Sequence, residues 1–452
     1  MAAGNEGRLH QTLKRVLNDV KPSEAEIAAA GAVSNDIMGR LRKVVPKNVE
    51  IILAGSVARG TQISGNSDID IFLLFPRSMD KEAMERRGME VAKRITNRKN
   101  GESYVIKYAE HPYLQLIFRK PPIKVDIVPA YKIRDSFEMG SSVDRTQLHN
   151  EFMLGHLTTR QKDDVRLVKA FMRFHNVYGA EAEREGFSGY LCELLVHHYG
   201  SFASVLGAFS ELRLPLCIDA KNRKVTNDPD AFKRFGSDFI VIDPTDPERN
   251  VAAVVSRTAL ARMVLASRRF LANPAAKLFY GAEFGDDRSG GKLRRIAGRM
   301  GVDAYFLTFR VPDISRDIIF QQLGRLAARL EKRLDDNSFA PALSLYNMDG
   351  GIGVIAFFVN RYRILSVARD GPEVFMKGAC ESFMKRHKTT YVRGHRVVAI
   401  ERSKYSGPRD LLRQELKNDV PSHLKAARLS VNSVPEGVAK LVYRKYVEAT
   451  TL

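Results

Sequence analysis

Three aspartates near the start of the chain lie in apolar, strand-like segments, where a carboxylate needs a partner. Asp68 and Asp70 begin the segment DIDIFLLF, and Asp126 lies in the segment KVDIVPAY. Because successive side chains of a strand point to opposite faces, we expect Asp68 and Asp70 on one face and Ile69 and Ile71 on the other. Mg²⁺ prefers carboxylate and phosphate oxygens, and two such cations can stabilise the attacking and leaving oxygens of a phosphoryl transfer. The aspartates predict this metal-assisted chemistry, with Asp126 as the third ligand from a neighbouring strand.

A Gly-Ser turn precedes these aspartates, and Ser56 stands twelve positions before Asp68. Gly55 and Ser56 end an expected strand, where backbone N–H groups and a hydroxyl can hold phosphates. Arg59 adds a guanidinium fork that suits the same group. A single Asp-x-Asp or a single Gly-Ser turn means little, but the ordered set favours nucleotidyl transfer from a nucleoside triphosphate.

The aspartates need a sheet and covering helices to position them. Strands are predicted at about 49–53, 69–75, 113–118 and 124–128. A helix is expected after Pro22, with Ser23 and Glu26 as a capping box, and a polar helix is expected at about 81–96. These segments predict a mixed α/β catalytic unit.

The rest of the chain shows two further sequence patterns, one after the other. From about residue 163 the pattern is helical, and Ser188 is the expected N-cap of an apolar helix over 189–199. Beyond about 266, a leucine stripe from Leu323 to Leu334 lies between strand-like runs, which indicates an α+β region. Since 452 residues exceed what one hydrophobic core usually supports, we expect an α+β multidomain chain. The expected parts are a catalytic domain at 1–145, a helical domain at 146–265 and an α+β region at 266–452.

The charge balance of the chain favours a polyanionic partner. Lys and Arg number 72 against 52 Asp and Glu, which gives a formal charge of +20. Nucleic acid is therefore the first partner to consider, although a solubilising surface and a membrane-surface binder stay open. The candidate RNA-contacting segments are 288–299 and 385–404, where basic residues interleave with Tyr391 and His395.

Cysteine usage and hydropathy indicate the compartment. The three cysteines, Cys192, Cys217 and Cys380, are odd in number and lack metal-ligand spacing, which fits a reducing cytosol. The longest apolar run, at about 352–359, is too short to cross a bilayer, and the first residues lack an apolar signal core. We expect a cytoplasmic protein without a membrane anchor.

Longer stretches around these residues resemble one enzyme family. They include GSVARGT, DIDIFLLFP, HPYLQLIF, VDIVPAYKI, SSVDRTQLH, VRLVKAFMRFHNVYGAE, GFSGYLCELLVHHYGSF, IDPTDPERNVAA and FRVPDI. With these stretches, spread over about residues 50–315, the chain resembles the archaeal-type, class I CCA-adding enzymes, tRNA nucleotidyltransferases of the polymerase β-like superfamily. The resemblance implies a nucleotidyltransferase head with a mixed sheet, a helical neck, and an α+β body and tail. It also implies an active site between head and neck.

The resemblance implies roles for particular residues. Asp68, Asp70 and Asp126 would be the catalytic, metal-binding carboxylates of a two-metal Mg²⁺ site. The residues that would contact the triphosphate of CTP or ATP are Gly55, Ser56, Arg59, His149, Lys169 and Tyr178. Arg249 would read the incoming base together with the bound RNA. Some members have Glu where this chain has Asp68, and either residue can ligate Mg²⁺. The implied reaction adds C, C and A to the acceptor end of tRNA and releases pyrophosphate.

Other interpretations of these residues stay open. Without the resemblance, Lys169 and Tyr178 would be an exposed helix charge and an aromatic at a core edge, and His149 an ordinary hydrogen-bonded histidine. His197 and His198 point about 100° apart on a helix, so we assign them no metal site. Alternative functions are a poly(A) polymerase, an oligoadenylate synthetase, an antibiotic nucleotidyltransferase, or a non-catalytic RNA-binding protein on this scaffold. The sequence does not decide between a monomer and a homodimer.

Overall fold

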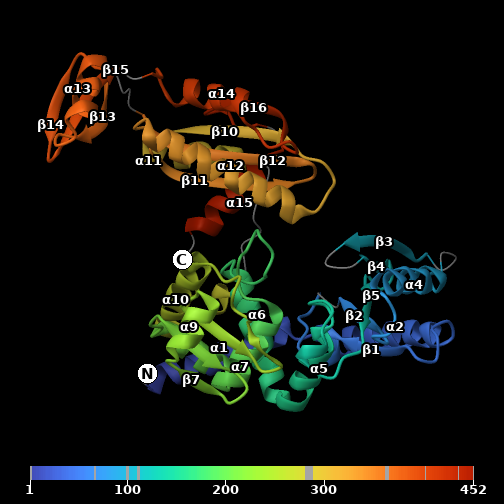
Figure 1. The fold of residues 1–452 in the computed structure, drawn as a ribbon. Coiled ribbons are helices and arrows are strands. Elements are labelled where there is room, and N and C mark those ends of the chain that lie inside the picture. Colours follow the sequence, from blue (N-terminus) through green and yellow to red (C-terminus); the bar gives the residue numbers. More distant parts are fainter. Residues whose placement is uncertain are drawn as a thin grey trace. The chain divides into compact units, whose positions relative to one another are not determined.

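The computed structural model describes residues 3–65, 68–97, 101–108, 112–279, 289–361, 366–402, 404–435 and 437–450. These residues form two compact units, and the division falls between Phe279 and Ser289 (Figure 1). The first unit holds the three aspartates and every other residue expected to contact the nucleotide. Within the described ranges, no helix is both long and apolar enough to span a membrane.

A five-stranded mixed sheet forms the centre of the head. Its strand order is β1-β2-β5-β4-β3, in which β2 and β5 are parallel and the other neighbours are antiparallel. The strands are β1 (Glu50–Ala54), β2 (Ile69–Phe75), β3 (Ser103–Tyr108), β4 (Pro112–Ile117) and β5 (Lys124–Tyr131). All four predicted strands are present, and β3 is an addition. Its mostly exposed side chains at the sheet edge lack the apolar alternation by which a strand is recognised in a sequence.

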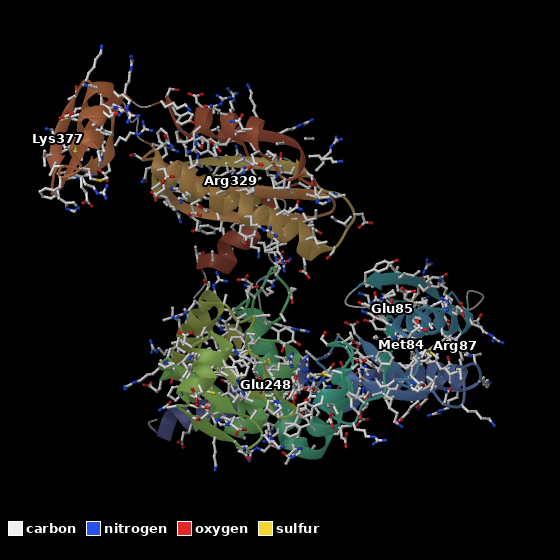
Figure 2. The ribbon with its side chains drawn as sticks, viewed as in Figure 1. Met84, Glu85, Arg87, Glu248, Arg329 and Lys377 are labelled. Atoms are coloured by element: carbon white, nitrogen blue, oxygen red, sulfur yellow. The ribbon has the colours of Figure 1, made fainter. Side chains whose placement is uncertain are left out.

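Two helices pack on this sheet and begin at the expected residues. In α2 (Glu24–Arg42), Ser23 Oγ accepts from the Glu26 backbone N–H at 3.2 Å, and Glu26 Oε2 accepts from the Ser23 N–H at 2.8 Å. The predicted capping box is therefore confirmed. Asp80 caps α4 (Lys81–Arg94), which buries Met84 in the head core and exposes Arg87 (Figure 2).

The neck gathers helices from both ends of the first unit. The helix α1, at the start of the chain, packs against α6, and both contribute to one core with Val16, Phe171 and Leu195. Ser188 caps α7 as predicted, by accepting a backbone N–H at 3.1 Å. The helices are α1 (Ala3–Val20), α5 (Arg145–His156), α6 (Thr159–Phe174), α7 (Gly189–Tyr199), α8 (Phe202–Ser210), α9 (Pro229–Phe235) and α10 (Arg257–Ala272). Two short 3₁₀ turns also occur, η2 (Ser136–Glu138) before α5 and η3 (Ala276–Leu278) after α10.

The neck also contains a small sheet, which the sequence did not indicate. Its strand order is β7-β6-β8-β9, with β6 and β8 parallel. The strands are β6 (Leu216–Asp219), β7 (Lys224–Thr226), β8 (Phe239–Asp243) and β9 (Asp246–Asn250). They are only three to five residues long, and β9 reads DPERN, so they carry too few alternating apolar residues to be recognised from a pattern.

The second unit is an antiparallel sheet covered on both faces. The strand order is β11-β12-β10-β16. The strands are β10 (Val302–Arg310), β11 (Pro341–Asp349), β12 (Ile352–Asn360) and β16 (Lys425–Val431). One core contains the buried leucine stripe of α12 (Arg316–Asp336) and residues of α14 (Pro408–Asn418). The other contains residues of α11 (Ser289–Met300) and α15 (Ala439–Thr450). The predicted stripe is therefore core, and Arg329 lies on the solvent side of α12 (Figure 2).

A small excursion with its own core separates β12 from α14. It consists of β13 (Ser366–Glu373), α13 (Lys377–Arg386), β14 (Thr390–Arg393) and β15 (Arg396–Arg402), in the sheet order β13-β15-β14. Cys380 and Phe383 of α13 pack on Val397 and Ala399 of β15. The basic segment 385–404 therefore spans the end of a helix and two strands.

Candidate active site

The structure places two of the expected metal ligands side by side. Asp70 on β2 and Asp126 on β5 are partners across the parallel pair, and Asp70 also pairs with Ala54 of β1. Neighbouring strands lie about 4.8 Å apart and paired residues point to the same face, so the two carboxylates share one small region. Asp68 is exposed and lies just before β2, not within the strand as expected.

The two strand carboxylates repel each other in a region that water reaches poorly. Burial and then the neighbouring Asp126 raise the pKa of Asp70 to about 7, and Asp68 adds to the rise while Arg59 opposes it. Burial also raises the pKa of Asp126, although Gln115 opposes this by donating a 2.8 Å hydrogen bond from Nε2. A shared proton or a bound cation would relieve the repulsion between these two carboxylates.

The donor set fits a divalent cation. Carboxylate oxygens are the ligands that Mg²⁺ takes, and a cation between Asp70 and Asp126 would remove the repulsion that raises the pKa of Asp70. In the part of the chain that the structure describes, no three His, Cys, Asp or Glu side chains already stand at metal-binding spacing. A cation held by all three aspartates therefore requires Asp68 to draw nearer to the other two.

Gly55 is required by the close approach of the backbone to Asp70. Its φ is +72°, and a Cβ built there would lie 1.8 Å from Asp70 Oδ2. The expected Gly-Ser turn is the start of a one-turn helix, α3 (Gly55–Arg59), which places Ser56 next to Gly55 at the end of β1. Any side chain at position 55 would displace the carboxylate.

A buried ion cluster joins the head to the neck just after α3. Arg59 Nε lies 2.9 Å from Glu193 Oε2, and Lys169 Nζ lies 3.4 Å from Glu193 Oε1. Thr61 Oγ1 donates to Glu193 Oε1 at 2.5 Å, and its carbonyl accepts from Lys169 Nζ at 3.2 Å. All four residues are buried. Arg59 from the head is thus held by Glu193 of α7, which also pairs with Lys169 of α6, so both partners come from the neck.

The charges of this cluster do not cancel. Burial would raise the pKa of Glu193, but Arg59 and Lys169 hold it below its ordinary value. Burial lowers the pKa of Lys169, and Glu193 works against that decrease. With both cations protonated, the cluster holds two positive charges against one carboxylate, so it attracts an anion such as a polyphosphate. Glu193 was not singled out from the sequence, although an acidic residue inside the apolar helix GYLCELLV is a signal for buried charge pairing.

Tyr178 lies beside this cluster. A Cβ added to Gly189 would meet Tyr178 Oη at 3.1 Å and Lys169 Cε at 3.7 Å, so both side chains converge on the start of α7. The guanidinium of Arg173 lies 4.9 Å from the ring centroid of Tyr178. Burial raises the pKa of Tyr178 to about 12, so its hydroxyl keeps its proton and can act as a donor.

His149 and Arg249 meet in a second group around Asp243. His149 Nε2 lies 2.8 Å from Asp243 Oδ2, and Arg249 Nη1 lies 2.8 Å from the same oxygen. Tyr190 stacks on the His149 ring with centroids 3.8 Å apart and donates to Asp243 Oδ1 at 3.2 Å. Asp243 at the end of β8 therefore fixes both a helix residue and a residue of β9.

Electrostatics favour an ionised Asp243 in this group. Burial would raise its pKa, but hydrogen bonds from His149, Thr245 and Arg249 keep it well below the ordinary value. Burial lowers the pKa of His149, so the neutral ring donates through Nε2. The sequence reasoning missed Asp243, and its signal was an aspartate directly after the apolar run FIVI, a few positions before the expected base reader.

Three family models match successive parts of the chain. The nucleotidyltransferase domain matches residues 35–149, the second domain of tRNA nucleotidyltransferase matches 163–280, and the C-terminal domain of the CCA-adding enzyme matches 300–432. The CCA-adding enzyme of Methanocaldococcus jannaschii is 34% identical over 415 residues, which cover 90% of both chains. The CCA-adding enzyme of Pyrococcus abyssi is 32% identical over 452 residues, which cover 96% of this chain and 97% of the relative. The chain belongs to the CCA-adding enzyme family.

Membership of the CCA-adding family makes the chain a nucleotidyltransferase of α+β architecture. Nucleotidyltransferases that use nucleoside triphosphates generally need a divalent metal. Among solved structures, a chain of Cid1 poly(U) polymerase matches with a TM-score of 0.47 and 15% identity, covering 60% of this chain and 98% of that one.

The residues expected for a CCA-adding enzyme fall into two described groups. One runs from the aspartates through Arg59 to Lys169 and Tyr178, and the other joins His149 to Arg249. No described hydrogen bond or ion pair joins the aspartates to His149 or Arg249. Helix α7 connects the groups, because its Tyr190 bonds Asp243 while its Glu193, three positions later on the same face, anchors Arg59.

Asp70→Asn should stabilise the metal-free protein above pH 7. The folded pKa near 7 exceeds the ordinary value of 3.8, so the folded chain holds a proton that the unfolded chain has released. Ionising Asp70 therefore costs stability as the pH rises from about 4 through 7. In urea unfolding with a chelator, we expect the variant to gain on the order of 2–4 kcal/mol at pH 8 and nothing near pH 4. A variant less stable than the parent at pH 8 would contradict the repulsion.

Glu193→Gln should reduce the rate of nucleotide incorporation by more than its loss of folding stability accounts for. Loss of the carboxylate leaves Arg59 and Lys169 without a counter-ion and lowers the pKa of Lys169 further. We expect the rate to fall at least tenfold, with its decline at alkaline pH moving to lower pH as Lys169 loses its proton. The titratable groups facing Lys169 are Glu193, Cys192 and Arg59, and burial raises the pKa of the Cys192 thiol to about 12, so that thiol stays neutral.

The matched control is Glu102→Gln in the head. Glu102 is also buried and pairs with an arginine, Arg40, at 2.8 Å, but it contacts none of the expected site residues. Both variants should lose on the order of 3 kcal/mol of unfolding free energy. Only Glu193→Gln should lose activity at a temperature where both are folded, and equal activity losses would show that Glu193 is merely structural.

Proposed function

We propose that the protein adds C, C and A in order to the 3′ end of tRNA, using CTP and ATP and releasing pyrophosphate. The observation that carries this proposal is the sequence identity of 32–34% to CCA-adding enzymes over about nine tenths of the chain. The site supports it, because paired carboxylates and a buried cationic cluster suit a metal-bound triphosphate. A poly(A) polymerase or another member of the superfamily is the alternative.

In this proposal each group has a separate task. Asp68, Asp70 and Asp126 would hold two Mg²⁺ ions, which would offset the charge at the attacking and leaving oxygens. Gln115 fixes the Asp126 carboxylate through its hydrogen bond and so limits where a cation can sit. Gly55 leaves room for the Asp70 carboxylate.

The cationic cluster and its neighbours would receive the triphosphate. Arg59 and Lys169 supply charge from opposite sides of the head and neck junction, and Ser56 supplies a hydroxyl at the end of β1. Tyr178 keeps its proton and can donate to a phosphate oxygen. His149, neutral and stacked on Tyr190, would present its ring to the nucleotide near Arg249.

Arg249 is the residue proposed to read the base. Its side chain is about one third exposed while Asp243 holds Nη1, so its other donors are available from a fixed position. Donors held in this way discriminate by hydrogen bonding, because a wrong base leaves them without acceptors.

The proposed domains follow the sequence boundaries: a catalytic head at 1–145, a nucleotide-binding neck at 146–265 and a tRNA-binding region at 266–452. The family models at 35–149, 163–280 and 300–432 support this division. The proposed partner is the acceptor end of tRNA in the cytoplasm, and the formal charge of +20 supports an RNA partner. All three cysteines are free and buried, as a reducing compartment allows.

The assay that separates the candidates uses tRNA lacking its last three nucleotides. With CTP, ATP and Mg²⁺ we expect a product three nucleotides longer and then no further growth, resolved on a sequencing gel. Asp126→Asn should reduce incorporation by at least a thousandfold while tRNA binding persists, because it removes a proposed metal ligand. A growing ladder with ATP alone would favour poly(A) addition instead.

Arg249→Ala should relax the choice of base. We expect the ratio of CTP to UTP incorporation, measured as kcat/KM on the same truncated tRNA, to fall tenfold or more. The control is Arg234→Ala, which breaks the 3.0 Å ion pair between Arg234 and Glu248, the neighbour of Arg249 on β9 (Figure 2). Unchanged selectivity in Arg249→Ala, or an equal change in the control, would assign base selection elsewhere.

A further inference from the structure

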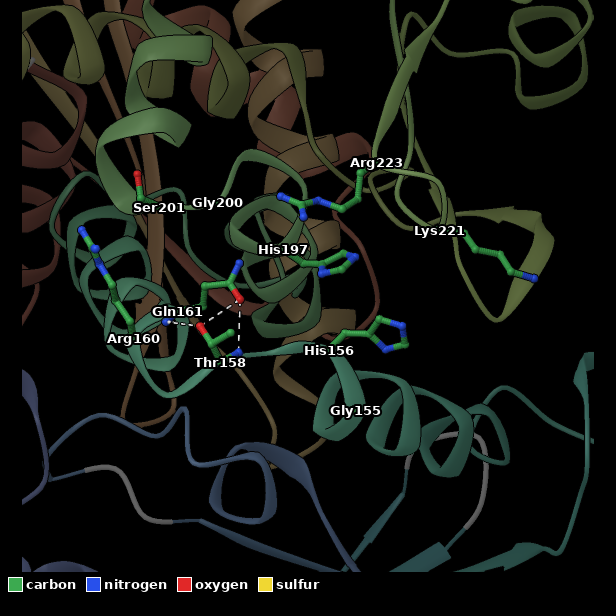
Figure 3. Close-up of a pocket in the computed structure, with 10 residues that line it drawn as sticks. All are labelled: Gly155, His156, Thr158, Arg160, Gln161, His197, Gly200, Ser201, Lys221 and Arg223. Carbon is green, nitrogen blue, oxygen red and sulfur yellow. Dashed lines mark hydrogen bonds between the residues drawn. The ribbon is translucent and has the colours of Figure 1, made fainter.

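One cavity in the first unit is lined by none of the residues assigned to the nucleotide. Its volume is about 690 Å³. Helices α5 and α7 end at it, α6 and α8 begin at it, and the turn between β6 and β7 closes one side (Figure 3). The cavity is therefore built from the neck alone.

The lining of this cavity is cationic. Arg160 comes from α6, whereas Lys221 and Arg223 come from the β6–β7 turn, and no Asp or Glu lines the cavity. Among the described residues, no carboxylate lies within ion-pair distance of these three cations, and Arg223 donates a long hydrogen bond of 3.4 Å to a backbone carbonyl. All three side chains are exposed, and Asp164 on the same helix is close enough to Arg160 for the arginine's charge to oppose the rise that burial causes in the pKa of Asp164. The lining itself is positive, so a bound anion would offset the repulsion among its cations.

His197 supplies an independent indication of a ligand. The residue is only 6% exposed and lines the cavity, yet its Nε2 has no hydrogen-bond partner in the described part of the chain. Buried polar atoms are normally paired, so this nitrogen lacks a group that the cavity could hold. Burial lowers the pKa of His197 to about 4, Arg223, His156 and His198 add to the decrease, and a backbone hydrogen bond with Ala220 opposes it, so the ring is neutral near pH 7.

Two helix N-termini strengthen that potential. Thr158 caps the sixteen-residue helix α6, Ser201 caps the nine-residue helix α8, and both capping residues line the cavity. Helix N-termini carry partial positive charge and favour anions. The cations and the helix ends therefore favour negative charge in one place, and the unpaired nitrogen of His197 lies at the same place.

We propose that this cavity binds phosphate groups, supplied either by an RNA backbone or by free phosphate or pyrophosphate. A phosphate offers several oxygens, which can accept hydrogen bonds from guanidinium forks and from a neutral imidazole N–H at once. The volume holds more than one such group. Binding of free anions does not rest on the proposed function, and only the RNA source does.

The test follows His197 by NMR in the full-length protein labelled with ¹³C-histidine, in a chelator that empties the carboxylate site. His197→Gln identifies the signal by its disappearance. Inorganic phosphate or pyrophosphate should move this signal and raise the apparent pKa of His197 by one unit or more, because the bound anion offsets Arg160, Lys221 and Arg223. A signal that neither phosphate, pyrophosphate nor an RNA stem with a single-stranded 3′ end moves would overturn the proposal.

Charge-removing variants locate the binding. Arg160→Gln with Arg223→Gln should abolish the shift. Lys221 is exposed at the turn, so Lys221→Gln alone should weaken binding severalfold without affecting the fold. Circular dichroism shows whether each variant is folded. A shift in the folded double variant equal to that of the parent would place the anion elsewhere and refute the proposal.

The source of the phosphate is decided by the salt dependence of RNA binding. If RNA supplies it, the slope of log Kd against log salt should decrease by about 0.7–0.9 for each phosphate group that the variants no longer neutralise. Lys132→Gln is the control, since Lys132 is already paired with Glu50 at 2.9 Å. If the variants lose the phosphate-induced shift of the His197 signal but keep the salt slope of RNA binding, the cavity binds free anions. If the salt slope changes as well, RNA supplies the phosphate.

Discussion

The repulsion between Asp70 and Asp126 is the constraint around which the first unit is organised. Parallel pairing of β2 and β5 sets the two carboxylates side by side, and the sheet cannot relieve them without losing its register. The surrounding residues adapt to this charge: Gly55 leaves space, Gln115 orients one carboxylate, and Arg59 supplies positive charge. Arg59 is itself buried, so it requires Glu193, and the demand for charge balance thereby extends from the head into the neck.

Glu193 and Asp243 have the same structural role in two parts of the first unit. Each is a fully buried carboxylate that holds two functional side chains from different elements. Buried ion pairs contribute little net stability, because desolvation offsets much of their attraction. Their value here lies in geometry: they fix Arg59 against Lys169 and His149 against Arg249, so that the nucleotide meets side chains that are already in position.

The elements with a local sequence pattern could be predicted from the sequence. The strands that are too short to show a pattern, and the contacts between buried charges, could not. The four head strands, the capping box at Ser23 and the leucine stripe of α12 were predictable because each depends on local pattern. The short sheet of the neck, and the partners of Lys169, were not. Glu193 lies twenty-four positions from Lys169 and more than a hundred from Arg59, so only the tertiary fold brings them together.

The chain crosses between head and neck twice. Helix α1 belongs to the neck core, α2 belongs to the head core, and α5 returns with Leu148 in the head core and Met153 in the neck core. Between these two crossings the head meets the neck a third time, because Ile63 lies in the neck core and Arg166 of α6 donates to the carbonyls of Gly60 and Gln62. A rotation of the head against the neck would therefore have to break these contacts together with the ion pair of Arg59 and Glu193.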